Sequence, residues 1–234
     1  MPGYYFYGID FYYLILIIPA IIISLIAQAR VKSTFAKYSS QNTLSHITGA
    51  QAAERVLRAN GVSGVKIERV SGSLTDHFDP KSNVIRLSES VYDQASVAAV
   101  GVAAHEAGHA VQYAQSYAPI KLRNAFVPVV NFGSSFSWIL LLMGVLFSFE
   151  PLILAGVICF GLVTVFHLLT LPVEFNASSR ALSAIKDSNI LYDDRELKGA
   201  RSVLSAAAMT YVAALILSLA QLLRLLLIFG RRRR

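Results

Sequence analysis

The chain has 234 residues, 55% of them hydrophobic and 15% charged, and its mean hydropathy is +0.53. This composition is too apolar for an ordinary soluble domain and indicates a membrane protein with a modest portion outside the bilayer. The net charge of +7 does not indicate a nucleic-acid partner, because the basic residues flank apolar segments, as they do when they set membrane orientation. The single cysteine, Cys159, excludes a disulfide framework and a cysteine-based zinc site.

Residues 1–29 are predicted to form an N-terminal membrane anchor. Residues 1–10 are rich in Tyr and Phe, which is typical of an aromatic belt at a membrane interface. Residues 11–29 are nearly free of charge and long enough to span a bilayer, and Pro19 is expected to kink this span in its middle. The first basic residue, Arg30, follows the apolar segment, so we expect a retained anchor rather than a cleaved signal peptide.

Residues 30–122 are predicted to form a polar block that begins with a helix and continues as a small sheet. Residues 48–60 have helical spacing, with Gly61 as the C-cap glycine. Three short segments are predicted as strands of an antiparallel sheet: residues 65–70, 74–78 and 83–88. An edge of this sheet can hold an extended peptide as an added strand, or the sheet can simply brace the helix that follows.

The motif H-E-A-G-H, from His105 to His109, lies within the predicted helix of residues 94–113. Residues four apart lie on the same face of a helix, so both imidazoles can reach one metal ion. Glu106 follows the first histidine, where a carboxylate can take a proton from a metal-bound water. An apolar helix does not readily hold these polar groups unless a metal offsets their desolvation. The motif therefore predicts a zinc site in the polar block.

Residues 123–172 are predicted to form a transmembrane hairpin. Its two apolar spans, residues 126–149 and 152–171, are joined by a short turn at Glu150, and Pro172 is expected to end the second span. Residues 173–203 form a second polar block. Residues 204–234 are an apolar segment with an arginine-rich tail.

This order of segments predicts the side of the membrane on which the zinc site lies. Two spans separate the polar blocks, so both blocks lie on the same side. Sixteen of the 21 lysines and arginines lie between Arg30 and Arg201, which predicts that the blocks face the cytoplasm. The remaining five are Arg224 and residues 231–234, which a full last span would place on the opposite side. Whether residues 204–229 cross fully is therefore open from sequence.

A catalytic zinc site usually has three protein ligands and one open position, so a third ligand is needed. The other histidines, His46, His77 and His167, and the scattered acidic residues are the candidates. Glu174 stands out because it lies at the mouth of a span, in the apolar segment LPVEFNASSRA. A carboxylate in this position is also commonly a solvated residue at the end of a helix.

The segments GVAAHEAGHAVQ and LPVEFNASSRAL, with DHFDPKSNVIRLSESVY before them, resemble the bacterial membrane family of neutral zinc metallopeptidases (YugP-like). The second segment is also similar in form to the E-F-x-A-D element of the prenyl-protein (CAAX) and HtpX membrane metallopeptidases, in which the glutamate is the third zinc ligand. The resemblance implies a gluzincin-type site in which His105, His109 and Glu174 bind Zn²⁺ and Glu106 is the general base. It also implies an integral protein of the bacterial inner (cell) membrane.

This chain departs from the E-x-x-x-D form, because Ser178 stands where the aspartate would be. The aspartate of those relatives steadies a ligand histidine, so Asn176 and Ser178 are the two candidates for that role. His167 lies seven residues before Glu174 and is a candidate to stabilise an oxyanion; the alternative is a hydrogen-bonded histidine within a span. His77 is a candidate substrate contact or, alternatively, a surface turn residue. Arg180 is expected to pair with an acidic neighbour.

The fold predicted is a mainly α-helical membrane protein with a small antiparallel sheet and a zincin-like active-site helix (gluzincin-type core). The leading function is a membrane-bound zinc endopeptidase acting on peptides or membrane proteins. One alternative is a site-2-type intramembrane protease, but such enzymes take an aspartate ligand from within a span, and no apolar segment here supplies one. The other is a non-catalytic membrane scaffold, whose structural zinc would need four protein ligands.

Overall fold

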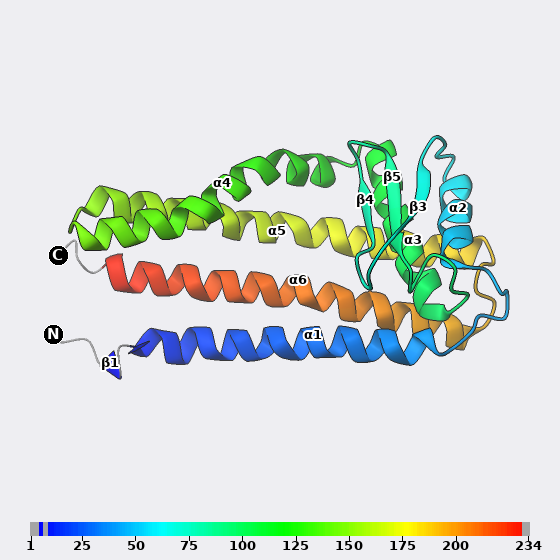
Figure 1. Cartoon of the computed structure of the whole chain (residues 1–234), viewed down its shortest axis with the longest axis horizontal. Coiled ribbons are helices and arrows are strands. Elements are labelled where there is room, and N and C mark those ends of the chain that lie inside the picture. The colour runs from blue at the N-terminus through cyan, green and yellow to red at the C-terminus, as the bar shows by residue number, and fades with distance from the viewer. Residues whose placement is uncertain (1–4, 7–8, 231–234) are drawn as a thin grey trace. The chain divides into compact units, whose positions relative to one another are not determined.

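The computed structural model describes residues 5–6 and 9–230 (Figure 1). The predicted aromatic belt at residues 1–10 lies partly outside this range, and the arginine run 231–234 lies wholly outside it. Six helices are described: α1 (Ile18–Ser39), α2 (Gly49–Ala59), α3 (Val97–Ala114), α4 (Ala118–Leu146), α5 (Glu150–Asp187) and α6 (Asp194–Phe229). Five strands are described: β1 (Tyr5–Phe6), β2 (Ile9–Asp10), β3 (Lys66–Val70), β4 (His77–Asp79) and β5 (Val84–Ser88).

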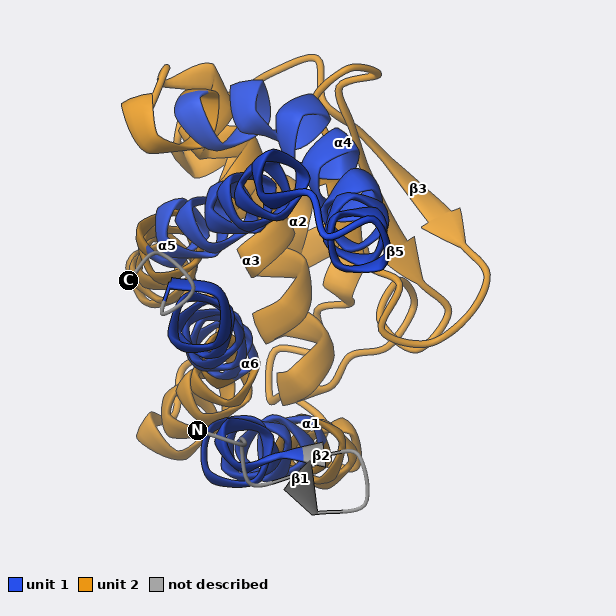
Figure 2. Cartoon of the chain, turned by 90° about the vertical axis from the view of Figure 1, so that its left-hand side faces the viewer, with its two compact units in different colours: residues 1–28, 122–171, 210–234 blue, residues 29–121, 172–209 orange. Residues whose placement is uncertain are grey.

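The chain divides into two compact units, each assembled from segments far apart in sequence (Figure 2). Unit 1 comprises residues 1–28, 122–171 and 210–234, and unit 2 comprises residues 29–121 and 172–209. The H-E-A-G-H helix α3 and the segment around Glu174 both belong to unit 2. The candidate ligands are therefore all found within one unit.

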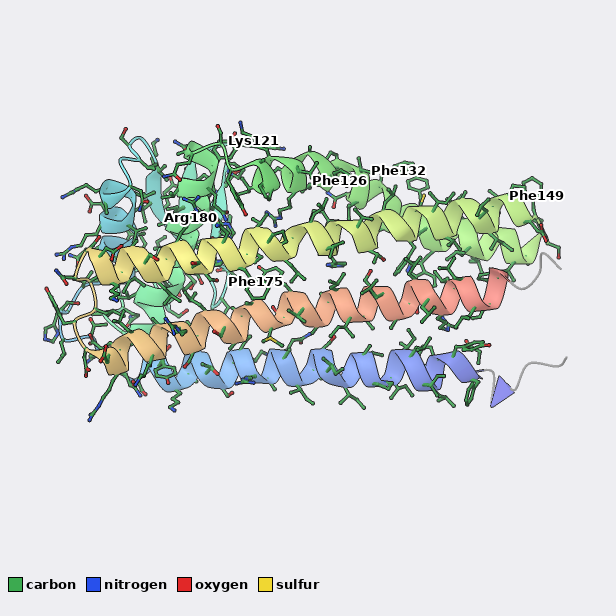
Figure 3. All side chains as sticks on the ribbon, turned by 180° about the vertical axis from the view of Figure 1, so that it is seen from behind. Lys121, Phe126, Phe132, Phe149, Phe175 and Arg180 are labelled. Atoms are coloured by element: carbon green, nitrogen blue, oxygen red, sulfur yellow. The ribbon has the colours of Figure 1, made fainter. Side chains whose placement is uncertain are left out.

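Four helical stretches are long and apolar enough to cross a membrane: Tyr13–Ser39, Ala118–Leu146, Glu150–Asp187 and Asp194–Phe229. The prediction of a mainly α-helical membrane protein is confirmed, and each helical stretch extends beyond its predicted apolar span at one end at least. Large apolar side chains are exposed along these helices, as Phe132 of α4 is, and in the turn before α5, as Phe149 is (Figure 3). In a bilayer such side chains face lipid, so they need no protein partner.

Two prolines lie inside helical spans, and one of them departs from the prediction. Pro172 was expected to end a span, but it lies inside α5, which continues to Asp187. A proline removes one backbone donor and strains one turn, and a helix held on both sides of it can continue. Pro19 lies within the candidate span Tyr13–Ser39, as predicted, two residues after the π-helical turn Tyr13–Ile17 and at the second residue of α1; the predicted kink stays a prediction.

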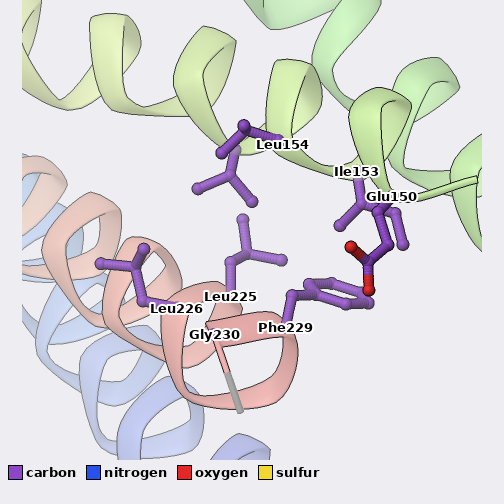
Figure 4. A pocket seen from close by; sticks show the side chains of 8 residues that line it. Glu150, Ile153, Leu154, Leu225, Leu226, Phe229 and Gly230 are labelled. Atoms are coloured by element: carbon purple, nitrogen blue, oxygen red, sulfur yellow. The ribbon is translucent and has the colours of Figure 1, made fainter. Parts of the chain in front are cut away.

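Unit 1 contains a cavity of about 260 Å³ between the start of α5 and the end of α6 (Figure 4). Its lining residues are mainly aliphatic: Glu150, Ile153, Leu154, Val157, Leu225, Leu226, Phe229 and Gly230. Glu150 is the only charged side chain among them. None of these residues is a candidate metal ligand, so this cavity is separate from the predicted zinc chemistry.

The sheet of unit 2 has the strand order β3-β5-β4 and is mixed rather than wholly antiparallel. The β4–β5 hairpin is antiparallel, with Phe78 opposite Ile85, as the turn residues between them predicted. In contrast, β3 pairs with β5 in parallel, with Ile67 opposite Ile85. The chain leaves β3, crosses to the far edge and returns as β5, so the last strand lies in the centre. Alternation of side chains reveals a strand but does not reveal this order.

Helix α3 is buried on nearly all sides, and its small residues explain how. Ser96 caps its first turn by accepting a hydrogen bond from the N–H of Ala99 at 3.2 Å. Most buried positions along it are Ala, Gly or Val, and a Cβ on Gly101 would lie 3.6 Å from Ala200 of α6. Small side chains let neighbouring backbones come close, so α3 forms the centre of unit 2.

Candidate metal centre

The two motif histidines lie one helical turn apart on α3. Their ring centroids are 4.6 Å apart and the ring planes meet at 83°, so the rings present their edges to a shared space. The Nε2 atoms of His105 and His109 lie 3.1 Å from each other. Two imidazole nitrogens at this distance can bind the same metal ion, as the four-residue spacing predicted.

Glu174 on α5 brings a carboxylate to the same point. Its Oε2 lies 3.3 Å from Nε2 of His105 and 3.5 Å from Nε2 of His109, and the residue is only 2% exposed. Zinc bonds of about 2.1 Å in tetrahedral geometry place ligand atoms roughly 3.4 Å apart. The three ligand atoms, 3.1, 3.3 and 3.5 Å apart, have this spacing. The donor set His, His, Glu therefore fits zinc, and these three residues form a cluster that can hold a metal ion.

Gly108, between the two histidines, allows this convergence. A Cβ at that position would lie 2.8 Å from the carbonyl oxygen of Ala177, which is backbone of α5. Such contacts are too short for a side chain, so only glycine allows α3 to approach α5 this closely. This role of Gly108 was not predicted from the sequence; a glycine inside a helix is the signal that could have indicated it.

Each histidine also has a partner for its second ring nitrogen. Ser178 Oγ lies 3.2 Å from Nδ1 of His105, and Gln112 Oε1 lies 3.1 Å from Nδ1 of His109. Asn176 contacts Gln112 rather than a histidine. Of the two outer residues that the sequence proposed, Ser178 thus contacts a motif histidine directly. The contact of Gln112 with His109 was not predicted, because the position of the Gln112 side chain depends on the packing of α3 against α5.

Glu106 completes the polar groups of α3 and is 9% exposed. Its charge acts on His109, whose pKa reflects opposing influences. Burial lowers the pKa of His109, but the hydrogen bond that it donates to Glu174, the negative charges of Glu106 and Glu174, and the contact with Gln112 outweigh burial and raise it. The surroundings of His109 therefore favour positive charge, which is the electrostatic character of a cation-binding site.

The remaining predicted residues lie elsewhere. His77 is exposed on β4, and its Nδ1 lies 2.8 Å from the backbone oxygen of Thr75, a contact within its own turn. His167 belongs to unit 1, so its role near the cluster stays a prediction. The expectation that Arg180 pairs with an acidic neighbour is wrong. Arg180, labelled in Figure 3, donates instead to the amide oxygens of Asn176 and Gln115, at 2.7 and 2.6 Å.

The comparisons with known proteins agree with this geometry. A family model described as "Putative neutral zinc metallopeptidase" matches residues 13–230. The chain is 48% identical over 217 residues to a protein of Bacillus subtilis (strain 168) named "Putative membrane protease YugP". The alignment covers 93% of this chain and 96% of that protein. No solved structure matches the chain.

Proposed function

Because the chain belongs to the family of neutral zinc metallopeptidases, we propose that it is a membrane-bound zinc endopeptidase with its active site near the cytoplasmic interface. The convergence of Nε2 of His105, Nε2 of His109 and Oε2 of Glu174 carries the proposal. In this assignment the three residues are the zinc ligands. Three protein ligands leave one coordination position open, which is the arrangement of catalytic rather than structural zinc sites.

Glu106 is assigned as the general base. Bound zinc supplies the usual chemistry of such sites, because it lowers the pKa of a coordinated water to about 7 and polarises the scissile carbonyl. The Glu106 carboxylate accepts the proton of the attacking water and returns it to the amine nitrogen that leaves. Its place next to His105 on α3 keeps the carboxylate beside the ligands, and its burial limits competing proton exchange with bulk water.

The substrate is proposed to be a peptide segment that pairs with β4. This strand is at one edge of the sheet, and Phe78 on it packs edge-on against Tyr113 of α3, with ring centroids 6.0 Å apart. An edge strand offers backbone donors and acceptors to an extended peptide. Since β4 lies against the helix that carries Glu106, a peptide on this edge runs close to the cluster.

The cytoplasmic orientation is proposed from charge. Sixteen of the 21 lysines and arginines lie between Arg30 and Arg201, where unit 2 has its polar segments. The side can be tested with Glu89→Cys, an exposed position near β5, in a Cys159→Ala background. A membrane-impermeant maleimide should label this cysteine only after cells are opened. Labelling in intact cells would contradict the orientation.

The activity is tested with Glu106→Gln in purified, zinc-loaded, full-length protein and an unstructured protein such as casein as substrate. We expect zinc content to stay at the wild-type level while proteolysis falls by roughly 100-fold or more, because general base catalysis contributes about 10²–10⁴-fold. Glu89→Gln, the same change at an exposed site, should leave both unchanged. Full proteolysis by Glu106→Gln would sink the assignment, and no proteolysis by wild type would favour a non-catalytic zinc protein.

A further inference from the structure

We propose that Gln112 is a positioning residue that holds the ring of His109 in the tautomer and orientation needed for metal binding, and that Arg180 fixes the direction of the hydrogen bonds around Gln112. The proposal rests on the ligands assigned under the proposed function. It adds a chain of polar side chains that links the motif helix α3 to α5.

Gln112 lies one turn after the second histidine and is fully buried, with 0% exposure. Its Oε1 lies 3.1 Å from Nδ1 of His109, and its Nε2 lies 2.8 Å from the carbonyl oxygen of Val173 and 2.9 Å from Oδ1 of Asn176. Val173 directly precedes Glu174. One amide therefore touches a proposed ligand on α3 and the backbone beside the proposed ligand on α5.

Arg180 determines which way these bonds run. A guanidinium group only donates, so the Asn176 atom that Arg180 Nε contacts at 2.7 Å is the carbonyl oxygen. That oxygen and the backbone oxygen of Val173 both face Gln112, so the Gln112 amide must turn its nitrogen toward α5. Its oxygen is then left facing His109.

The tautomer of His109 follows from this orientation. An amide oxygen cannot donate, so Nδ1 of His109 carries the hydrogen and donates it to Gln112. The lone pair is then on Nε2, the atom that lies 3.1 Å from Nε2 of His105 and 3.5 Å from Oε2 of Glu174. A neutral imidazole oriented by an acceptor on its second nitrogen is the form that binds a metal well.

Within the described part of the chain, the hydrogen-bond partners of Arg180 include no carboxylate. Its Nη1 donates to Oε1 of Gln115 at 2.6 Å, and its guanidinium lies over the Tyr117 ring, 5.7 Å from the centroid. Two neutral amide oxygens and an aromatic face fix the position of the cation while leaving its charge largely uncancelled. A charged donor polarises the amide chain more strongly than a neutral one would.

The test measures metal binding rather than peptide hydrolysis. Full-length wild type, Gln112→Leu, Gln112→Glu and Arg180→Met are stripped of metal in detergent, and zinc is titrated against a competing chelator. Gln112→Leu should raise the Kd for zinc by about 10–100-fold, the usual effect of losing the partner of a ligand histidine. Gln112→Glu keeps an oxygen toward His109 but loses the N–H donors toward Val173 O and Asn176 Oδ1, so its affinity should lie between those of wild type and Gln112→Leu.

Cobalt binding gives the second readout, because the visible spectrum of Co²⁺ reports the geometry of its ligands. The bands of Gln112→Leu should shift, whereas those of the control Gln94→Leu, an exposed glutamine before α3, should match wild type. Arg180→Met should weaken zinc binding by less than Gln112→Leu does. Unchanged zinc affinity and an unchanged cobalt spectrum in Gln112→Leu would overturn the proposal, and an unchanged Arg180→Met would overturn the part assigned to Arg180.

The proposal can be tested even if Gln112→Leu does not fold. If Gln112→Leu does not fold, Gln112→Glu decides, and a loss of zinc affinity as large as about 100-fold, the loss expected when Nδ1 of His109 has no partner at all, overturns the orienting role. The outcomes also distinguish this proposal from the proposed function. If zinc binding depends on Gln112 but wild type cleaves no peptide, only the proposed peptidase activity is contradicted. If wild type is active but Gln112→Leu binds zinc as tightly as wild type, only the role proposed for Gln112 is contradicted.

Discussion

Apolar side chains face outward in much of unit 1, whereas in unit 2 they pack inside. The main buried cluster described within unit 1 consists of Leu141, Ile153, Val157 and Leu225. The cluster of unit 2 runs from Phe35 to Leu204 and includes half of the residues of α3. Lipid can surround the apolar side chains of unit 1, so they need few contacts with one another. The second must exclude water from the surroundings of three polar ligands, which only dense packing achieves.

Buried polar groups show the same contrast. In unit 1, polar contacts tie one helix to another, as Thr164 and Ser218 do with their hydroxyl oxygens 2.7 Å apart. In unit 2, Glu174 and Gln112 are buried as parts of a cluster that can hold a cation. Changes in unit 2 should therefore affect metal binding first, whereas comparable changes in unit 1 should affect only stability.

The largest loss of zinc is expected when Glu174 is substituted. Glu150 is the matched control, because it lies on the same helix, α5, but in unit 1. Glu174→Ala should lose most of its zinc, with an affinity loss beyond the roughly 100-fold upper range for an outer partner of a ligand. Glu150→Ala, in unit 1, should retain about one zinc per chain. Elemental analysis of detergent-purified protein measures both. Tight zinc binding by Glu174→Ala would place the third ligand elsewhere.

A glycine in each unit gives a second, smaller contrast. Gly108→Ala forces a Cβ to within 2.8 Å of Ala177 O, so α3 and α5 must separate, at a cost of about 1–3 kcal/mol. Gly161→Ala in unit 1 meets nothing within 4 Å and should be neutral or stabilising by up to about 1 kcal/mol. Thermal unfolding and zinc titration measure the pair. Equal zinc affinity in both variants would show that the close approach at Gly108 does not matter for the metal.

The ion pair of Asp10 and Arg224 in unit 1 should give the smallest effect on the site. Burial raises the pKa of Asp10, but the hydrogen bonds and charge of Arg224 and the N–H of Tyr13 outweigh it, so the pKa lies below its usual value. A lowered folded-state pKa means that the pair contributes its full stability above the unfolded pKa of about 4 and loses it as pH falls. Asp10→Asn should destabilise the protein by about 1.5–3 kcal/mol at pH 7.

This difference should shrink as the pH falls through about 4, and zinc affinity at pH 7 should not change. Denaturant unfolding of wild type and Asp10→Asn at several pH values measures the first expectation. A difference that is independent of pH, or a loss of zinc affinity at pH 7, would argue against a purely stabilising role confined to unit 1.

Much of the architecture could be predicted because its causes are local. Four apolar segments predicted four helices, and the spacing in H-E-A-G-H placed two histidines on one helical face. Turn residues after Asp79 predicted the β4–β5 hairpin. The parallel pairing of β3 with β5 could not be predicted in the same way, because it depends on where a crossing chain finds an unpaired strand. The continuation of α5 through Pro172 likewise depends on packing on both sides of the proline.

The sequence by itself determined the helix that carries both histidines and Glu106, because a period of 3.6 residues is a property of the backbone alone. Only the tertiary structure decided that Glu174, 65 residues after His109, comes within 3.5 Å of it. Only the tertiary structure decided that Gln112 would face His109 across a contact that Gly108 makes possible. Such contacts arise where two helices meet, and the distance between helices depends on every side chain packed between them.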